Sequence, residues 1–134
     1  MAIRGKIVLV PLLGVAGLAL MGAAGPRALT PAMSGLWAIG QASDGHDAQR
    51  LCISDMRALA QWEHRSRHCR QTIIADGQSG AIVEYVCANG DFGRSDIKIL
   101  TPRTLRIQTQ GISKSFPFAY TLHARRLGAC APAR

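Results

Sequence analysis

The stretch CRQTIIADGQSGAIVEYVC, residues 69–87, has the clearest local pattern in this chain. Two runs rich in β-branched and aromatic residues lie on either side of a glycine-rich turn, which is the pattern of a β-hairpin. If the turn is centred on Gln78, residues that lie equally far before and after Gln78 face each other, so Cys69 faces Cys87. Opposed Cα atoms of an antiparallel pair lie about 4.5 to 5.5 Å apart, a distance that a disulfide spans. The hairpin therefore predicts a Cys69–Cys87 disulfide.

The register of this hairpin also predicts which side chains share a face. Counting from the same centre pairs Ala75 with Ala81, Ile73 with Val83, and Gln71 with Tyr85. Successive side chains of a strand point to opposite sides, so these pairs and the two cysteines line one mostly apolar face. A β-bulge at Gly80 would shift the register by one residue and separate the two cysteines.

The other two cysteines, Cys52 and Cys130, lie far apart in the chain. An even number of cysteines in a small exported domain indicates disulfides, and elimination pairs Cys52 with Cys130. That bond would fasten the end of the chain to the segment before the expected helix. The rival pairing, Cys52–Cys69 with Cys87–Cys130, would bracket that helix and stays open. No two cysteines have C-x-x-C spacing, so the sequence does not predict a zinc site.

The first 24 residues have the layout of a secretory signal peptide. Arg4 and Lys6 precede an apolar run without charged residues, and the small residues Gly22–Ala24 end it. The run is about long enough to span a bilayer, so an uncleaved anchor in the inner membrane is the alternative. Pro11 and the glycines within the run favour cleavage. We therefore expect a periplasmic or secreted protein.

The exported part has the length of one domain. We expect a linker over residues 25–34, a β domain over residues 35–130 and a tail over residues 131–134. Besides the hairpin, alternating apolar residues predict strands at residues 35–41, 51–54, 95–101, 104–110 and 116–127. The only helix expected lies at residues 54–66, with Ser54 as its cap. The sequence thus predicts a mainly β fold: a single curved antiparallel meander sheet or partial barrel of about seven strands, with one short helix and two disulfides.

Short motifs occur in a fixed order: GLWAI near the expected mature N-terminus, LCIS before the helix, then YVCANGDFG, and RRLGAC at the end. In these motifs the chain resembles a family of small exported bacterial proteins known only as domain of unknown function 3617. The similarity runs from Gly35 to Cys130. It departs at Ala38, where the family often has an acidic residue, and at Ile53-Ser54, where it often has Thr-Pro. The resemblance implies an envelope protein with four paired cysteines, and it implies no activity.

The chain is basic, with a formal charge of +8 that falls to +6 when Arg4 and Lys6 leave with the signal peptide. The cations are spread out and aromatic residues do not interleave with them, so we expect no nucleic-acid partner. If the last three strands are neighbours, their wet face carries a positive stripe of Lys98, Arg106, His123 and Arg125. Such a stripe is either a solvated face that prevents edge pairing or a site for an anionic lipid or glycan.

The sequence offers few candidates for metal binding or catalysis. His64 and His68 stand four residues apart, the spacing of two metal ligands on a helix, but no third ligand is evident. Two exposed histidines near a helix C-terminus are also favourable there when charged. The chain has no Gly-x-Ser-x-Gly motif, and cysteines in disulfides are not nucleophiles. We therefore expect no metal, no cofactor and no enzymatic activity.

The aromatic residues of interest are Trp37, Phe116, Phe118 and Tyr120. The last three fall on every second position of the final strand, so they share a face. We expect all four to lie in the core. The alternative is that a curled sheet keeps a ligand cavity lined by them.

The function that these features favour is non-catalytic. We expect a monomeric, exported envelope accessory or binding protein that carries a small apolar or amphipathic ligand, such as a lipid. The alternative is a structural or interaction module that docks on an anionic envelope component or on a protein through its basic face. A filled cavity would favour the carrier, and salt-sensitive binding would favour docking.

Overall fold

A computed structural model describes residues 25–32 and 34–131, which form one antiparallel sheet of seven strands. The strands are β1 (Gly35–Gly40), β2 (Gln49–Ile53), β3 (Cys69–Asp76), β4 (Gly80–Cys87), β5 (Phe92–Thr101), β6 (Thr104–Ser113) and β7 (Phe116–Gly128). Their order in the sheet is β2-β1-β7-β6-β5-β4-β3, so β2 and β3 are its two open edges. The prediction of a mainly β fold with about seven strands in one curved sheet is confirmed.

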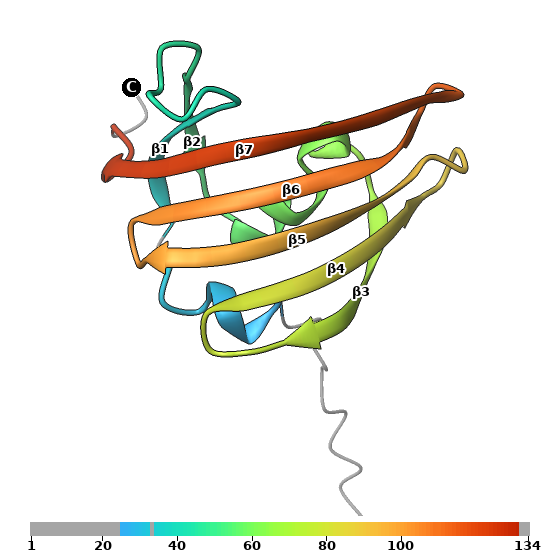
Figure 1. Ribbon diagram of the computed structural model, residues 1–134, viewed down its shortest axis with the longest axis horizontal. Coiled ribbons are helices and arrows are strands. Elements are labelled where there is room, and N and C mark those ends of the chain that lie inside the picture. Colours follow the sequence, from blue (N-terminus) through green and yellow to red (C-terminus); the bar gives the residue numbers. More distant parts are fainter. Residues whose placement is uncertain (1–24, 33, 132–134) are drawn as a thin grey trace, which may run out of the picture.

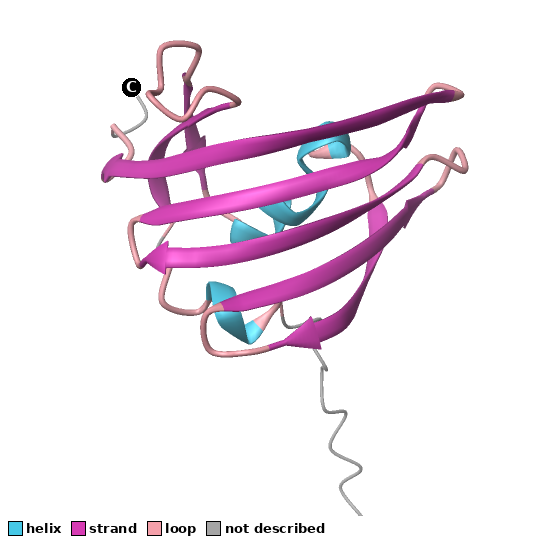
Figure 2. Ribbon diagram, viewed as in Figure 1, coloured by secondary structure: helices cyan, strands magenta, loops and turns pink. Residues whose placement is uncertain are grey.

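Two short 3-10 helices accompany the sheet, η1 (Arg27–Leu29) and η2 (Met56–His64). Strands β4–β7 form the front of Figure 1, and the sheet curves so that η2 lies behind them. Figure 2 shows the same arrangement, with the helical segments in cyan against the inner face of the sheet. η2 packs on β4, β5 and β6. The concave face of the sheet is therefore filled by the chain itself.

The expected helix exists, but it is not an α-helix and Ser54 does not cap it. It is a 3-10 helix interrupted at Gln61, whose φ and ψ are −127° and 42°. Its N-cap is Asp55, whose carboxylate accepts a hydrogen bond from the backbone N–H of Arg57 at 2.9 Å. The cap lies one residue later than expected because the helix begins only at Met56.

The hairpin of β3 and β4 has the predicted register over most of its length. Cys69 faces Cys87, Gln71 faces Tyr85 and Ile73 faces Val83. The prediction that Ala75 faces Ala81 is wrong, because a bulge between Ile73 and Ala75 makes Ala75 face Ile82. The extra residue is in the first strand and not at Gly80, and it lies on the turn side of Ile73, so the register at the cysteines is kept.

Both predicted disulfides are present, and the rival pairing is excluded. The Cα atoms are 4.0 Å apart in Cys69–Cys87 and 5.6 Å apart in Cys52–Cys130. The second bond joins Cys52 of edge strand β2 to Cys130, which lies just after the end of β7 at Gly128. The tail of the chain is thereby fastened to the sheet, as the sequence led us to expect.

The core lies between the inner face of the sheet and η2. It contains Trp37 and Ile39 from β1, Leu59 and Trp62 from η2, and Ile107 at the centre of β6. The segment expected as a linker also takes part: Leu29 and Ala32 are buried in this core, and Asp76 accepts hydrogen bonds from the backbone N–H groups of Arg27 and Ala28. The domain thus includes residues before Gly35.

The expected signal peptide, residues 1–24, lies outside the described residues, as do residues 132–134 of the expected tail. Within the described part, no helix has the length and apolar character needed to cross a bilayer. The two disulfides fit a protein that folds in an oxidising compartment.

Candidate functional site

The four aromatic residues do not line a common cavity. Trp37 is fully buried in the core. Phe118 and Tyr120 are half-buried, with ring centres 5.8 Å apart, and the Tyr120 hydroxyl donates a hydrogen bond to Glu63. Phe116 is 74% exposed, so its placement in the core was wrong. It begins β7, directly after the turn that joins β6 to β7.

The register brings the predicted basic stripe together on the outer face of the sheet. Lys98 of β5 faces Arg106 of β6, and Arg106 faces His123 of β7. Arg125 lies in the neighbouring row, opposite Thr104 and Ala38. The four residues lie on three neighbouring strands, with His123 and Arg125 both on β7, and they form an open row on the outer face without a cleft around them.

A more concentrated basic surface lies at the other end of the sheet order, beside edge strand β3. A cleft of about 770 Å³ separates β3 from η2 and from the loop of residues 65–68, which we call the basic loop. The cationic side chains that line this η2–β3 cleft are Arg57, Arg65, Arg67, His68 and Arg70. Asp55 is the one carboxylate among its lining residues, and it is paired with Arg57 at 2.7 Å.

The cations of the cleft are held in place in different ways. The guanidinium of Arg65 lies 4.1 Å from the ring centre of Trp62 and donates a hydrogen bond to the Trp62 carbonyl. Arg67 donates to Asp91 at 3.1 Å. Arg70 is exposed and makes no ion pair or side-chain hydrogen bond with the described part of the chain. The cleft therefore combines preorganised guanidinium groups with donors that are open to a ligand.

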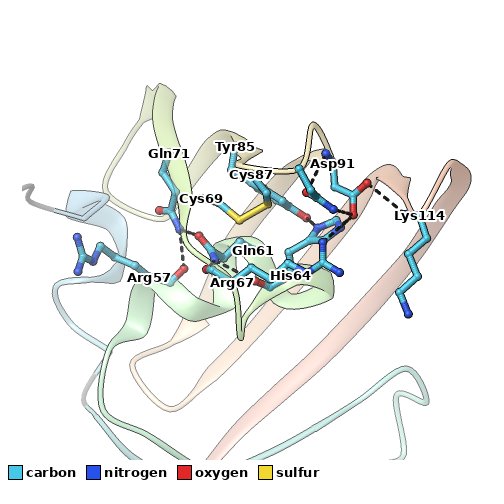
Figure 3. Close-up of a disulfide and its surroundings, with 11 residues drawn as sticks. Arg57, Gln61, His64, Arg67, Cys69, Gln71, Tyr85, Cys87, Asp91 and Lys114 are labelled. Carbon is cyan, nitrogen blue, oxygen red and sulfur yellow. Dashed lines mark hydrogen bonds and ion pairs between the residues drawn. A yellow bond between two sulfur atoms is a disulfide. The ribbon is translucent and has the colours of Figure 1, made fainter.

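A buried polar network lies directly under the basic loop (Figure 3). His64 Nδ1 lies 3.1 Å from the Tyr85 hydroxyl, and His64 Nε2 lies 3.3 Å from Asp91 Oδ2. Asp91 also accepts hydrogen bonds from the Asn89 side chain and from the backbone N–H of Lys114. These bonds, with the nearby charges of His64 and Arg67, hold the pKa of Asp91 below its ordinary value.

This network corrects the expectation that His64 and His68 are two exposed histidines. The His64 side chain is 2% exposed, whereas His68 is on the surface. The reason is tertiary: the turn after β4 delivers Asp91 to the end of η2, and the ring of Phe118 lies 5.9 Å from the imidazole. Within the described residues, no group of three or more histidine, cysteine and acidic side chains is arranged to hold a metal ion.

The His64–Asp91 pair has the composition of a catalytic dyad. In the described part of the chain, the hydroxyl bonded to His64 is that of Tyr85, and burial raises the pKa of this phenol above its ordinary value. The neighbouring Cys69 and Cys87 are joined in a disulfide and cannot attack a substrate. The arrangement is suited to fixing the basic loop from below.

This cleft was not predicted, although the sequence carries a local signal for it. Residues 65–70, RSRHCR, contain three arginines and one histidine, which is the densest run of basic residues in the chain. His68, with His64 just before the run, was predicted only as a candidate metal ligand, and the three arginines only add to the general positive charge. The run becomes a site because η2 and β3 hold it at the wall of a cleft.

A shallow groove on the outer face offers the exposed apolar surface that a carrier would need. It measures about 570 Å³ and is bordered by Val86 and Phe92, which are 51% and 48% exposed. The inner face of the sheet, where a half-barrel would hold its ligand, is instead packed against η2.

Comparisons with protein-family models, with curated proteins and with solved structures found no match. The resemblance to domain of unknown function 3617 therefore stays a prediction.

Proposed function

We propose that this protein is an exported, non-catalytic binding module of the cell envelope that docks on an anionic component through the η2–β3 cleft. The observation that carries the proposal is the charge of the cleft: four arginines and one histidine line it, and two of these arginines, Arg65 and Arg70, have no carboxylate partner in the described part of the chain. This develops the second function expected from the sequence, docking on an anionic partner, and moves its contact surface from the outer stripe to the cleft.

The chemistry of the cleft favours carboxylate or phosphate groups. A guanidinium is planar, stays charged, and presents donors in a fork that matches the two oxygens of such groups. The stacking of Arg65 on Trp62 keeps one fork in place before a ligand arrives, so less side-chain entropy is lost on binding. The cleft also excludes part of the water around its charges, whereas water surrounds and screens the charges of the outer stripe.

The carrier function has weaker support. An apolar ligand inside the curved sheet would have to displace Leu59 and Trp62, which are buried in the core. The outer groove at Val86 and Phe92 is the alternative place for such a ligand, and it is open to water over much of its area.

The test uses two double variants that each remove two positive charges. Arg65→Gln with Arg70→Gln alters the cleft, and Lys98→Gln with Arg125→Gln alters the outer stripe as the matched control. The probe is a fluorescent inorganic polyphosphate, and the readout is fluorescence anisotropy at low and at high salt. We leave Arg67 unchanged because it donates to the buried carboxylate of Asp91, so its replacement would also remove a contact that holds the basic loop.

We expect the cleft variant to weaken binding about tenfold or more, because two charge-assisted contacts are lost, and the control to stay close to the parent. Binding should also weaken as salt rises. Equal losses in both variants would mean that the chain attracts polyanions by net charge alone, and the proposal would then be wrong.

A further inference from the structure

We infer that the partner of the η2–β3 cleft is an extended acidic peptide segment, which adds to the open edge of β3 as an eighth strand. This inference rests on the proposed function and names the chemistry of its partner. Three features of the edge carry it: the direction of its free backbone groups, the side chains that hold η2 away from it, and the charges beside it.

The backbone of β3 presents unused hydrogen-bonding groups to the cleft. The Cα atoms of Cys69 and Cys87 are 4.0 Å apart, the close spacing of an antiparallel pair that shares no backbone hydrogen bond. In agreement, the Cys87 N–H donates to the Asp91 carbonyl and not to β3. Backbone groups alternate in direction along a strand, so those of Cys69, Gln71 and Ile73 point away from β4.

These same three residues are the ones through which β3 lines the cleft, apart from Arg70. In the described part of the chain, no backbone group outside the sheet bonds to them. An exposed edge of this kind is a template on which another strand can pair.

η2 does not occupy this edge because side chains keep it at a distance. Gln71 Nε2 donates to the Arg57 carbonyl at 3.0 Å and to Gln61 Oε1 at 2.8 Å. Gln61 in turn donates to the carbonyls of His64 and Arg67. As Figure 3 shows, this chain of amides spans from β3 to η2 on the inner side of the sheet. The space beside the β3 backbone stays open as the cleft.

The charges select an acidic segment as the occupant and disfavour a second copy of β3. The basic loop and Arg70 lie at the start of β3, and an added strand with carboxylates there would pair with them. A second β3, paired antiparallel, would place its own basic loop beside the far end of the first strand, and the one carboxylate of β3, Asp76, already accepts hydrogen bonds within its own chain. Farther along, Ile73 and Ile74 are 38% and 48% exposed, so the segment would also have aliphatic residues to cover them.

The experiment uses a fluorescent peptide of alternating glutamate and valine, with the 8-residue length of β3. The matched control is the same peptide with N-methyl groups on alternate amides, on the edge that would face β3. This change removes backbone donors and leaves side chains and charge as they were. We expect the N-methylated peptide to bind about tenfold more weakly than the parent peptide.

A second measurement on the unmodified protein follows amide hydrogen exchange. Binding of the parent peptide should slow exchange at Gln71 and Ile73 and leave Thr72, whose N–H points to β4, unchanged. If N-methylation has no effect on affinity, or if exchange at Gln71 and Ile73 is unaltered, strand addition is wrong. Polyphosphate has no amides, so a cleft-dependent affinity for it would then still support the proposed function. If the variant with Arg65→Gln and Arg70→Gln binds both polyphosphate and the peptide as tightly as the parent protein does, both proposals are wrong.

Discussion

His64 Nε2 lies 3.3 Å from Asp91 Oδ2, and the two side chains are 2% and 7% exposed. The same carboxylate oxygen accepts a hydrogen bond from Arg67 in the basic loop. One buried carboxylate from the turn after β4 therefore fixes both the end of η2 and the loop that follows it. The position of the basic cleft depends on this contact between two segments that are separate in sequence.

Asp91→Asn should flatten the dependence of stability on acidic pH. The pKa of Asp91 is held below its ordinary value of 3.8 in the folded protein, first by the hydrogen bond from Asn89. A lowered folded pKa contributes stability that is fully present above the unfolded pKa and is lost as the pH falls through the folded value. Thermal unfolding of the parent between neutral pH and pH values below about 4 should show this loss, and the variant should show less of it. Asp96→Asn, on β5, is the matched control, and an equal flattening there would contradict the assignment.

Cys130→Ser should destabilise the whole domain and loosen the end of β7. The Cys52–Cys130 bond closes a loop with a sequence separation of 78, for which the chain-entropy estimate is about 4 kcal/mol. Denaturant unfolding under non-reducing conditions measures this loss. A midpoint equal to that of the parent would show that the tail cysteine has no structural role.

Trp37→Ala and Phe116→Ala should have very different effects. Trp37 is fully buried, so its truncation should reduce the free energy of unfolding by about 3 to 5 kcal/mol. Phe116 is 74% exposed, and its loss should change stability by less than about 0.5 kcal/mol. Chemical denaturation of both variants decides the point, and a large loss at Phe116 would mean that its ring is covered in solution.

Gly93→Ala should destabilise the sheet by about 1 to 3 kcal/mol, because the added methyl group would overlap the Tyr85 ring. Gly77→Ala is the control: its methyl group would meet only the Gly80 carbonyl oxygen, at 3.5 Å. Thermal unfolding of the two variants measures the difference. If both unfold like the parent, Tyr85 does not pack across Gly93, and the hydrogen bond between Tyr85 and His64 is also in doubt.

Much of the fold was accessible from local patterns in the chain. The hairpin register near Cys69 and Cys87 followed from the turn residues alone, and it located the short disulfide. The pairing predicted for Ala75 was wrong because the strand has a bulge there, and no residue pattern around Ile74 predicts this bulge. Phe116 was misplaced because alternation identifies which side chains share a face, whereas their burial depends on what covers that face.

The strands, the hairpin and the two disulfides could be predicted from the residues alone, because strand alternation and turn chemistry act between neighbouring residues. The position of RSRHCR, residues 65–70, at the wall of a cleft results from long-range contacts instead. That placement requires Asp91 beneath the loop and Gln71 between β3 and η2. Both contacts join residues that are distant in sequence, and their formation depends on how the sheet curves around η2.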